Sequence, residues 1–403
     1  MLTREDILAA RVRIRDGILE TPCIPARALE AMLPGRIYLK LENLQRTGSF
    51  KDRGALNRLL DLSDAERVHG VVTASAGNHA QAVAYHCGRL GIPAAVVMPE
   101  ATPLIKVANA RRYGASITFR GATLSDAMVE ALRIQTDEGR TLVHAFDDDR
   151  VIAGQGTIGL ELLEQVADLT NVVVPIGGGG LASGIATAIR HERPAVRITG
   201  VEAAAAASAL ASRNAGHIVR IETSETIADG IATKQVGERT FPLLERFVDA
   251  IVAVSEEQIA AAVHLLLERQ KLVAEGAGAA PLAALLTGLV PLHDDDVTII
   301  ILSGGNIDIN MVSRIIDRGL VADGRLARLG VRVRDRPGQL ARLTDRVARL
   351  GANVLEIAHR RAFADISVGD VEIVMHLETR GREHVAEIVR LFESEGLRVA
   401  EEQ

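Results

Sequence analysis

Apolar residues in the first 300 positions alternate between short continuous runs and amphipathic stretches. Short runs rich in Val, Ile and Ala predict buried strands, whereas apolar residues spaced three and four apart predict helices. Alternation of the two at this spacing predicts parallel βαβ units in an α/β domain. The expected strands are 37–41, 70–73, 94–98, 116–119, 171–175, 198–201 and 297–302, and the expected helices are 4–20, 78–90, 102–113, 123–138, 256–269 and one that ends at residue 189.

The pattern changes around residues 320–327. Beyond that stretch it predicts six elements in the order βαββαβ: strand 329–333, helix 339–350, strands 353–359 and 371–378, helix 382–395 and strand 397–400. About 75 residues in this order are enough for a small independent module. We therefore expect one domain over 1–320, a linker over 321–327 and a second domain over 328–403.

Composition and charge narrow the function classes. Hydrophobic residues make up 48% of the 403 residues but aromatic residues only 2%, which suits aliphatic parallel strands. A net charge of -6 gives no basic surface for nucleic acid, and 2 cysteines are too few for a disulfide framework or a thiolate metal site. No apolar run is long enough for a bilayer span, and no signal peptide is evident. We expect a cytoplasmic protein that binds neither nucleic acid nor membranes.

Lys51 is the first candidate for chemistry. It is one of five lysines and lies in the run Gly48-Ser49-Phe50-Lys51-Asp52. A lysine that acts as a nucleophile must be partly desolvated, so that its neutral amine is accessible. The alternative is an ordinary surface lysine beside Asp52. The aromatic ring of Phe50 and the compact Gly-Ser pair favour a shielded amine.

Three further loops follow predicted strands. They are Ser75-Ala76-Gly77-Asn78-His79, Gly177-Gly178-Gly179-Gly180-Leu181 and Ser303-Gly304-Gly305-Asn306. Amides at a helix start favour anions, and consecutive glycines let several amides converge on one phosphate. Simple helix caps or flexible turns are the alternatives. An amine that can form an imine, together with a phosphate loop, is what pyridoxal phosphate (PLP) requires.

The order of these segments along the chain resembles the PLP-dependent threonine/serine dehydratases, among them threonine ammonia-lyase. The resemblance implies PLP fold type II, the tryptophan synthase β-like α/β fold, with a small subdomain at about 49–148 inserted into the larger one. It implies β-elimination of L-threonine, and of L-serine, to 2-oxobutanoate or pyruvate and ammonia. A homo-oligomer, either a dimer or a tetramer, is expected.

The resemblance also assigns roles to residues. Lys51 would carry the cofactor and remove the α-proton, Asn78 would contact the cofactor's phenolic oxygen, and Ser303 would meet its pyridine nitrogen. A hydroxyl cannot keep that nitrogen protonated as a carboxylate would, which suits elimination better than transamination. The expected cofactor residues are Phe50, Lys51, Asn78, Gly177, Gly178, Gly179, Gly180, Leu181 and Ser303. The expected residues for the substrate carboxylate are Ser75, Ala76, Gly77, Asn78 and His79, of which His79 is interpreted as a structural neighbour rather than a base.

Two further sites follow from resemblance alone. Related enzymes bind a cation through residues that correspond to Glu202, Ala206 and Ser208, and a single carboxylate favours a monovalent ion such as K⁺. The alternative is a solvated glutamate at a strand end.

The C-terminal βαββαβ pattern, with Asp335-Arg336-Pro337-Gly338 at its first turn, resembles the amino-acid-sensing ACT domain. It implies an amino-acid effector, isoleucine or valine, at Gly338 and Asn353.

A dinucleotide site is one alternative for the glycine loop. The run Gly177-x-Gly179-x-x-Ala182, with Glu202 20 residues further on, fits a relaxed dinucleotide fingerprint and would predict an NAD-dependent dehydrogenase. That hypothesis leaves Lys51 and the other two loops unexplained.

Two more alternatives share the resembling fold. An amino-acid racemase needs an acid on the cofactor face opposite the lysine, and serine racemases carry a serine where this chain has Ala76. Racemisation is therefore disfavoured. A regulatory protein without chemistry is disfavoured because Lys51, Asn78 and Ser303 are all retained.

Overall fold

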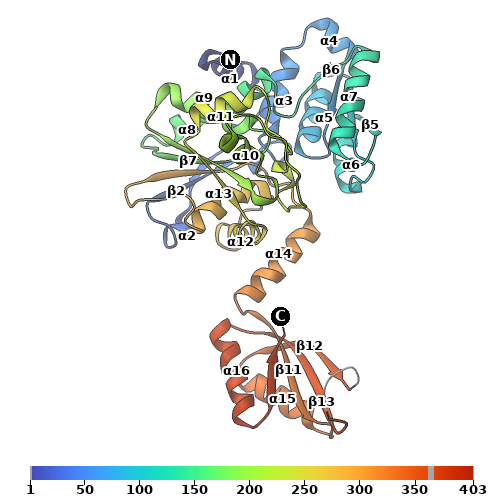
Figure 1. Cartoon of the computed structure of the whole chain (residues 1–403), viewed down its shortest axis with the longest axis vertical. Coiled ribbons are helices and arrows are strands. Elements are labelled where there is room, and N and C mark those ends of the chain that lie inside the picture. The colour runs from blue at the N-terminus through green and yellow to red at the C-terminus, as the bar shows by residue number, and fades with distance from the viewer. Residues whose placement is uncertain (1, 362–366, 403) are drawn as a thin grey trace. The chain divides into compact units, whose positions relative to one another are not determined.

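The computed structural model describes residues 2–361 and 367–402. The chain divides into two compact units, Met1–Ile307 and Asp308–Gln403. Figure 1 shows the sheets and helices of each unit in chain order. Each unit has hydrophobic core clusters of its own, so each is described separately.

The first unit contains a six-stranded sheet in the order β1-β2-β10-β7-β8-β9. All neighbouring pairs are parallel except β1 with β2. The bounds are β1 (Cys23–Pro25), β2 (Arg36–Leu41), β7 (Asn171–Pro175), β8 (Arg197–Ala203), β9 (Ala250–Val254) and β10 (Val297–Leu302). Strands β7 and β10 lie at the centre and are buried along their whole length. The loops that follow them leave the same edge of the sheet, where ligands bind in open α/β sheets.

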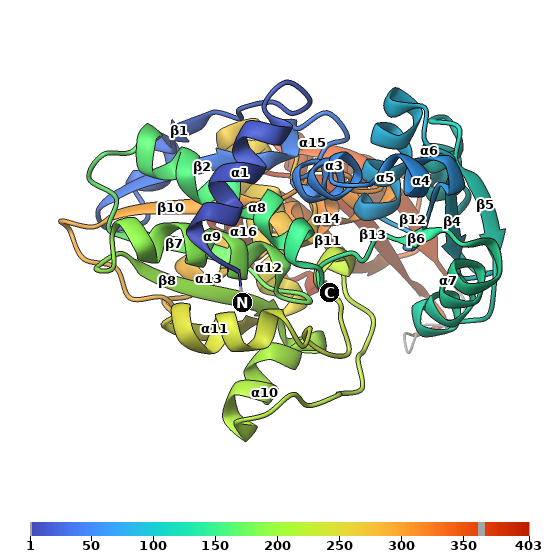
Figure 2. The same cartoon turned by 90° about the horizontal axis from the view of Figure 1, so that it is seen from above.

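Eight helices and four short helical turns accompany this sheet in the described part of the first unit. The helices are α1 (Arg4–Ile14), α2 (Arg27–Glu30), α8 (Asp149–Gln165), α9 (Gly180–Glu192), α10 (Ser208–Ala215), α11 (Thr240–Phe247), α12 (Glu256–Leu265) and α13 (Gly276–Leu286). The turns are η1 (Glu42–Leu44), η2 (Ala204–Ala206), η3 (Asp229–Ile231) and the π-helical η4 (Leu266–Gln270). Figure 2 shows α10 and the segment after it at the margin of this sheet and its helices.

A second, fully parallel sheet of four strands has the order β5-β4-β3-β6. Its strands are β3 (Val71–Ala74), β4 (Ala94–Met98), β5 (Ser116–Phe119) and β6 (Thr141–Leu142). The helices of this region are α3 (Lys51–Leu60), α4 (Asp64–His69), α5 (Asn78–Leu90), α6 (Leu104–Arg111) and α7 (Leu124–Glu138). In Figure 1 the four strands and α4–α7 lie together, apart from the larger sheet.

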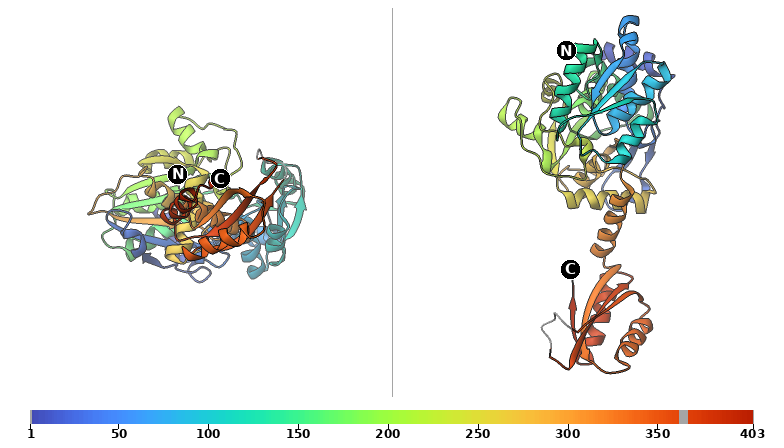
Figure 3. Two further views of the ribbon diagram at one scale, coloured as in Figure 1. Left: turned by 90° about the horizontal axis from the view of Figure 1, so that it is seen from below. Right: turned by 90° about the vertical axis from the view of Figure 1, so that its right-hand side faces the viewer.

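The second unit begins with α14 (Ile309–Ala322) and continues in the predicted βαββαβ order. Its sheet is antiparallel, in the order β12-β13-β11-β14. Alternate residues of the strands, such as Leu329 and Ile373, share one core with Val347 and Ile388 of the two helices. Both helices therefore cover the same face of the sheet, and Figure 3 gives two further views of this unit. The elements are β11 (Leu326–Arg334), α15 (Gln339–Arg349), β12 (Asn353–Arg360), β13 (Asp370–Glu378), α16 (Arg382–Ser394) and β14 (Arg398–Glu401).

Several expected elements have different bounds in the structure. The first helix was expected to reach residue 20 but ends at Ile14, three residues before Gly17. Helix α8 was not predicted, because Gly154, Gly156 and Gly159 lower its helix propensity, although every residue from Val151 to Leu162 is buried. Its glycines permit close packing: a Cβ on Gly154 would lie 2.6 Å from the carbonyl oxygen of Arg53 on α3.

Candidate active site

Lys51 opens α3, directly beside the end of the central strand β10. The Phe50 amide donates to the Ser303 carbonyl at 3.0 Å, and Ser49 forms a bridge with Gly304. The Lys51 Nζ donates to the Ala145 carbonyl at 2.7 Å and lies 5.0 Å from the centroid of the Phe50 ring. Burial lowers the pKa of Lys51 to about 8, against the opposing field of Glu275. A much larger share of this amine is therefore neutral near pH 7 than of an ordinary lysine, although the protonated form still prevails below pH 8.

Hydrogen bonds join three of the predicted segments. The Gly305 amide donates to the Gly48 carbonyl at 2.9 Å. The Asn306 Nδ2 donates to the Thr47 carbonyl at 2.7 Å and to the Asn78 Oδ1 at 2.8 Å. The Lys51 segment, the loop at the start of α5 and the loop after β10 therefore meet at one place.

The glycine loop reaches the same place from the end of β7. Gly179 has a φ of +95°, which favours glycine, and a Cβ on Gly178 would lie 2.3 Å from the Phe146 ring. Phe146 follows Ala145, whose carbonyl accepts from Lys51. The loop is held by Thr240, which donates to the Gly178 carbonyl at 2.7 Å. Tight contact with Phe146 thus places the loop near the lysine.

The segment from Ser75 to His79 forms the turn between β3 and α5. The Gly77 amide donates to the Ser75 Oγ at 3.3 Å, and a Cβ on Gly77 would meet nothing within 4 Å. The space beside this helix start is open, and amides there favour a carboxylate. Ala76 packs against the core of the smaller sheet.

His79 is a buried, neutral imidazole. Its Nε2 lies 3.0 Å from the Val143 carbonyl, which is consistent with a proton on that nitrogen. Burial, together with the nearby charge of Lys51, lowers the pKa of His79 to about 3. This environment supports the interpretation of His79 as a structural neighbour.

The sequence reasoning missed three side chains of the site: Phe146, Thr240 and Glu275. Glu275 is buried, and both of its carboxylate oxygens accept from the Asn78 Nδ2, at 2.8 and 3.0 Å. In the sequence, a glutamate before a glycine reads equally well as a helix cap. Burial raises the pKa of Glu275 to about 7. Phe146 and Thr240 gave no sequence signal.

Buried ion pairs anchor the helix that begins at Lys51. Arg53 donates to the Glu42 carboxylate through two bonds of 2.8 Å and also pairs with Glu161 on α8. Glu161 also pairs with Lys40 of β2. Burial alone would raise the pKa of Glu42, but Arg53 holds it below its usual value. These pairs connect α3 to β2, η1 and α8, and so restrict the position of the lysine.

The three residues proposed for a cation lie around the start of α10. Glu202 is 0% exposed, and its carboxylate accepts from the amides of Ala209 and Leu210, both at 2.8 Å. Ser208 lies 3.5 Å from the hydroxyl of Thr233, and Ala206 is buried. Glu202 is therefore not a solvated strand-end residue. Its orientation toward α10 also gives no support to a ribose-binding role.

The two residues proposed for an effector lie in the second unit. Gly338 has a φ of +90° and precedes α15, and Asn353 opens β12. The Asn353 Nδ2 donates to the Glu378 carboxylate at 3.3 Å. The amides at the start of α15 have no partners within the helix and suit a carboxylate.

Comparison with known proteins identifies the family. The model for pyridoxal-phosphate dependent enzymes matches residues 14–304, and the model for the ACT domain matches residues 327–394. The chain belongs to the pyridoxal-phosphate dependent enzymes. The L-threonine ammonia-lyase of Thermotoga maritima is 47% identical over 399 residues, which cover 99% of each chain.

Solved structures also match this chain. The processed form of threonine deaminase isoform 2 from Solanum lycopersicum is 37% identical with a TM-score of 0.74, over 78% of this chain and 91% of that one. A maize serine racemase is 35% identical with a TM-score of 0.75, over 80% of this chain and 98% of that one. The predicted fold class, PLP fold type II with a C-terminal ACT domain, is confirmed. The dinucleotide alternative is not supported, because the family match includes the glycine loop.

The residues present fit pyridoxal phosphate. Helix α9 begins at Gly180 with Gly179 as its N-cap, so the amides of the glycine loop lie at a helix start, which favours phosphate. Side chains on Gly178 or Gly179 would collide with Phe146 or Thr240, so this tight loop requires glycine. The hydroxyl of Ser49 is buried and has no hydrogen-bond partner among the described residues. Together with the low pKa of Lys51, these features match an anionic, aldehyde-bearing cofactor.

Two observations bear on other sites. No helix within 2–361 or 367–402 is long and apolar enough to cross a membrane.

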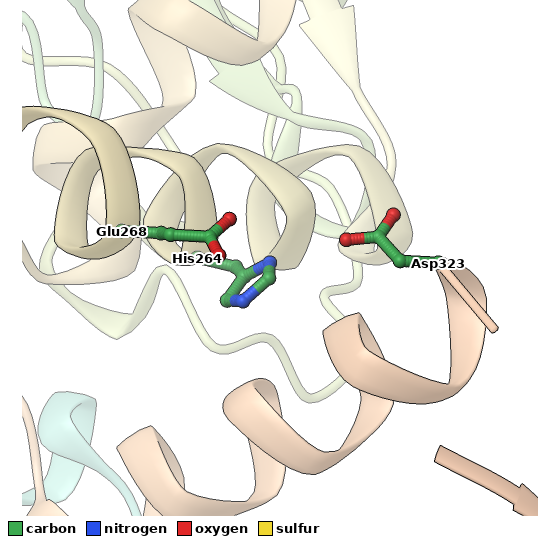
Figure 4. Close-up of side chains that lie close together, drawn as sticks. All are labelled: His264, Glu268 and Asp323. Carbon is green, nitrogen blue, oxygen red and sulfur yellow. The ribbon is translucent and has the colours of Figure 1, made fainter. Parts of the chain in front are cut away.

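Figure 4 shows His264 and Glu268, which lie four residues apart on α12 and η4 and are both partly exposed. Asp323, also drawn there, belongs to the second unit. We assign no metal site to these residues, because such exposed groups are common without an ion.

Proposed function

We propose that this chain is a PLP-dependent L-threonine ammonia-lyase that also accepts L-serine, forming 2-oxobutanoate or pyruvate and ammonia. The observation that carries the proposal is the position of Lys51. Its buried amine, with a pKa lowered to about 8, lies where the loops of Asn78, Gly178 and Ser303 converge. The full-length match to a protein named L-threonine ammonia-lyase supports threonine as the substrate.

The roles of the residues follow from their environments. Bound pyridoxal phosphate supplies an electron sink for the charge that develops at the substrate α-carbon. The Lys51 amine would take the α-proton, because its lowered pKa gives it a larger neutral fraction than an ordinary lysine has. By the family resemblance, the Ser303 hydroxyl would meet the pyridine nitrogen, and the amides beside Gly77 would hold the substrate carboxylate. Phe50 and the glycine loop, from Gly177 to Leu181, hold the ring and the phosphate.

Turnover across a panel of 3-hydroxy amino acids tests this function. We expect oxo acid to accumulate fastest from L-threonine, with slower release from L-serine. Chiral analysis should find only the L-isomer in the residual substrate, because the methyl group of Ala76 cannot donate a proton to the face opposite Lys51. Substantial D-serine or D-threonine would instead support the racemase alternative, and a protein inactive on the whole panel would contradict the proposal.

A monovalent cation is proposed at Glu202, the carbonyl of Ala206 and the hydroxyl of Ser208. An all-oxygen set with a single carboxylate suits K⁺ or NH₄⁺ better than Mg²⁺. Activity should be higher in K⁺ or NH₄⁺ than in Na⁺, and Glu202→Ala should weaken this dependence. The measurement is initial rate against cation concentration in chelator-treated buffer. Equal rates without K⁺ would return Glu202 to the purely structural role of binding the amides of α10.

Amino-acid regulation is proposed for residues 328–403, and catalysis for residues 1–320 with a small subdomain at about 49–148. The expected linker at 321–327 falls on the end of α14 and the start of β11, and the two compact units divide earlier, between Ile307 and Asp308. The amides beside Gly338 would hold the carboxylate of isoleucine or valine, and Asn353 would meet its amine. We expect an effector to change substrate affinity by about 5- to 150-fold. Asn353→Ala should abolish this response without changing the basal rate. If no common amino acid binds or alters the rate of the full chain, the module serves only assembly into a dimer or tetramer.

A further inference from the structure

Glu275 is a buried carboxylate that no step of the proposed reaction uses. It precedes α13 and is only 5% exposed. Both of its oxygens accept from one group, the Asn78 Nδ2. Removing a carboxylate from water is costly unless strong donors compensate, so this residue calls for an explanation.

Asn78 is held on its other side as well. Its Oδ1 accepts from the Asn306 Nδ2 at 2.8 Å, and that nitrogen also donates to the Thr47 carbonyl at 2.7 Å. The oxygen and nitrogen of an asparagine amide can be exchanged by rotating the side chain by half a turn. Here the Glu275 carboxylate can only accept a hydrogen bond, and the Asn306 NH₂ group can only donate one. Only one orientation of the Asn78 amide satisfies both neighbours. Glu275 and Asn306 together therefore determine which end of that amide faces which way.

Glu275 also lies against the residues that the proposed function places at the cofactor ring. Its amide donates to the Gly304 carbonyl at 3.0 Å, and a Cβ on Gly304 would lie 2.5 Å from the Glu275 Oε1. The carboxylate thus lies between Asn78 and the residue that follows Ser303. Both bonds to Glu275 come from one nitrogen, the Asn78 Nδ2, and an NH₂ group carries two N–H donors. A single N–H directed between the two carboxylate oxygens can serve both, and the second N–H is then left for a ligand.

We infer that Glu275 is a positioning residue that orients the Asn78 amide, so that its second N–H faces the phenolic oxygen of the cofactor. The inference rests on the proposed function, which assigns that contact to Asn78. Asn306 secures the same orientation from the carbonyl end of the amide. Glu275 acts through Asn78 and has no covalent role.

The electrostatic environment makes this arrangement sensitive to pH. Burial raises the pKa of Glu275 to about 7, assisted by Asp229 of η3 and opposed by Asn78, by Lys106 of α6 and by Lys51 of α3. The ionised form is the one that accepts the Asn78 N–H with both oxygens. As the pH falls through about 7, the carboxyl gains a proton and its hold on Asn78 weakens.

The test is Glu275→Gln, which keeps the size of the side chain but removes its charge. We expect the dissociation constant for pyridoxal phosphate, measured by absorbance titration of the apoprotein, to rise by roughly 10- to 100-fold, the worth of a hydrogen bond to a charged group. The visible band of the wild-type holoprotein should change with pH near 7, and the band of the variant should not. In an Asn78→Ala background the same substitution should have little further effect.

Two variants sharpen the result. Asp229→Asn removes a nearby negative charge that raises the pKa of Glu275, so the pH dependence of the band should persist with its midpoint at a lower pH. Asn306→Ala, at an exposed position, should weaken cofactor binding by about 3- to 10-fold and keeps the test valid if Glu275→Gln does not fold. An unchanged dissociation constant and band in both Glu275→Gln and Asn306→Ala, or an undiminished effect without Asn78, would overturn the inference. A wild-type protein that binds no pyridoxal phosphate would instead contradict the proposed function.

Discussion

Lys51→Ala is expected to lower the turnover of L-threonine by on the order of 10³-fold or more, because it removes both the covalent anchor and the base. The holoprotein should absorb at about 410–420 nm, and the variant should lose this band. Because the pKa of Lys51 is lowered to about 8, apoprotein should take up the cofactor faster as the pH rises through that value. Absorbance during reconstitution measures both effects.

The control for this prediction is another lysine. Lys271 is exposed and donates only to the Glu268 carbonyl, so Lys271→Ala should keep the band. Borohydride reduction followed by peptide mapping locates the modified residue directly. Labelling of Lys40 or Lys106 in place of Lys51 would refute the assignment.

Arg53→Ala is expected to lower the free energy of unfolding by about 3–5 kcal/mol, because it removes the ion-pair partner of the buried Glu42 carboxylate and leaves Glu161 paired with Lys40 alone. Chemical denaturation of the full-length apoprotein, followed by fluorescence or circular dichroism, measures the loss. In the wild type, Arg53 keeps the pKa of Glu42 low. The Arg53–Glu42 ion pair therefore stabilises the fold at pH values above the usual carboxyl pKa. Without Arg53, burial raises the pKa of Glu42. The difference in free energy of unfolding between the wild type and the variant should therefore shrink as the pH falls and the Glu42 carboxyl becomes neutral.

An exposed arginine provides the matched control. Arg133 pairs with Glu130 and Asp137 on the surface of α7, where solvent screens the charges. Arg133→Ala should therefore cost only about 0–1 kcal/mol. Equal losses for the two variants would show that the buried pairs do not anchor α3 as described.

Much of the fold could be predicted from local patterns. The strands at Ala94–Met98, Ser116–Phe119, Asn171–Pro175 and Val297–Leu302 and the helix at Asn78–Leu90 lie where the apolar pattern put them. These elements are continuous apolar runs or one-sided stripes, which a sequence displays directly. Helix α8 was missed because its three glycines, Gly154, Gly156 and Gly159, read as helix breakers in the sequence, whereas in the fold they allow close packing against neighbouring helices.

The sequence by itself determined the family, the shielded lysine and the three loops, because each of these depends on neighbouring residues in one short segment. Only the tertiary structure decided how they combine. Asn78 meets Glu275 and Asn306, 197 and 228 residues further along the chain, and Arg53 meets Glu161 across 108 residues. Such pairs depend on which strands lie side by side and how deeply their ends are buried. Local periodicity carries no information on the pairing of strands or on the burial of their ends. A polar residue looks the same in sequence whether its hydrogen-bond partner is water or a distant residue.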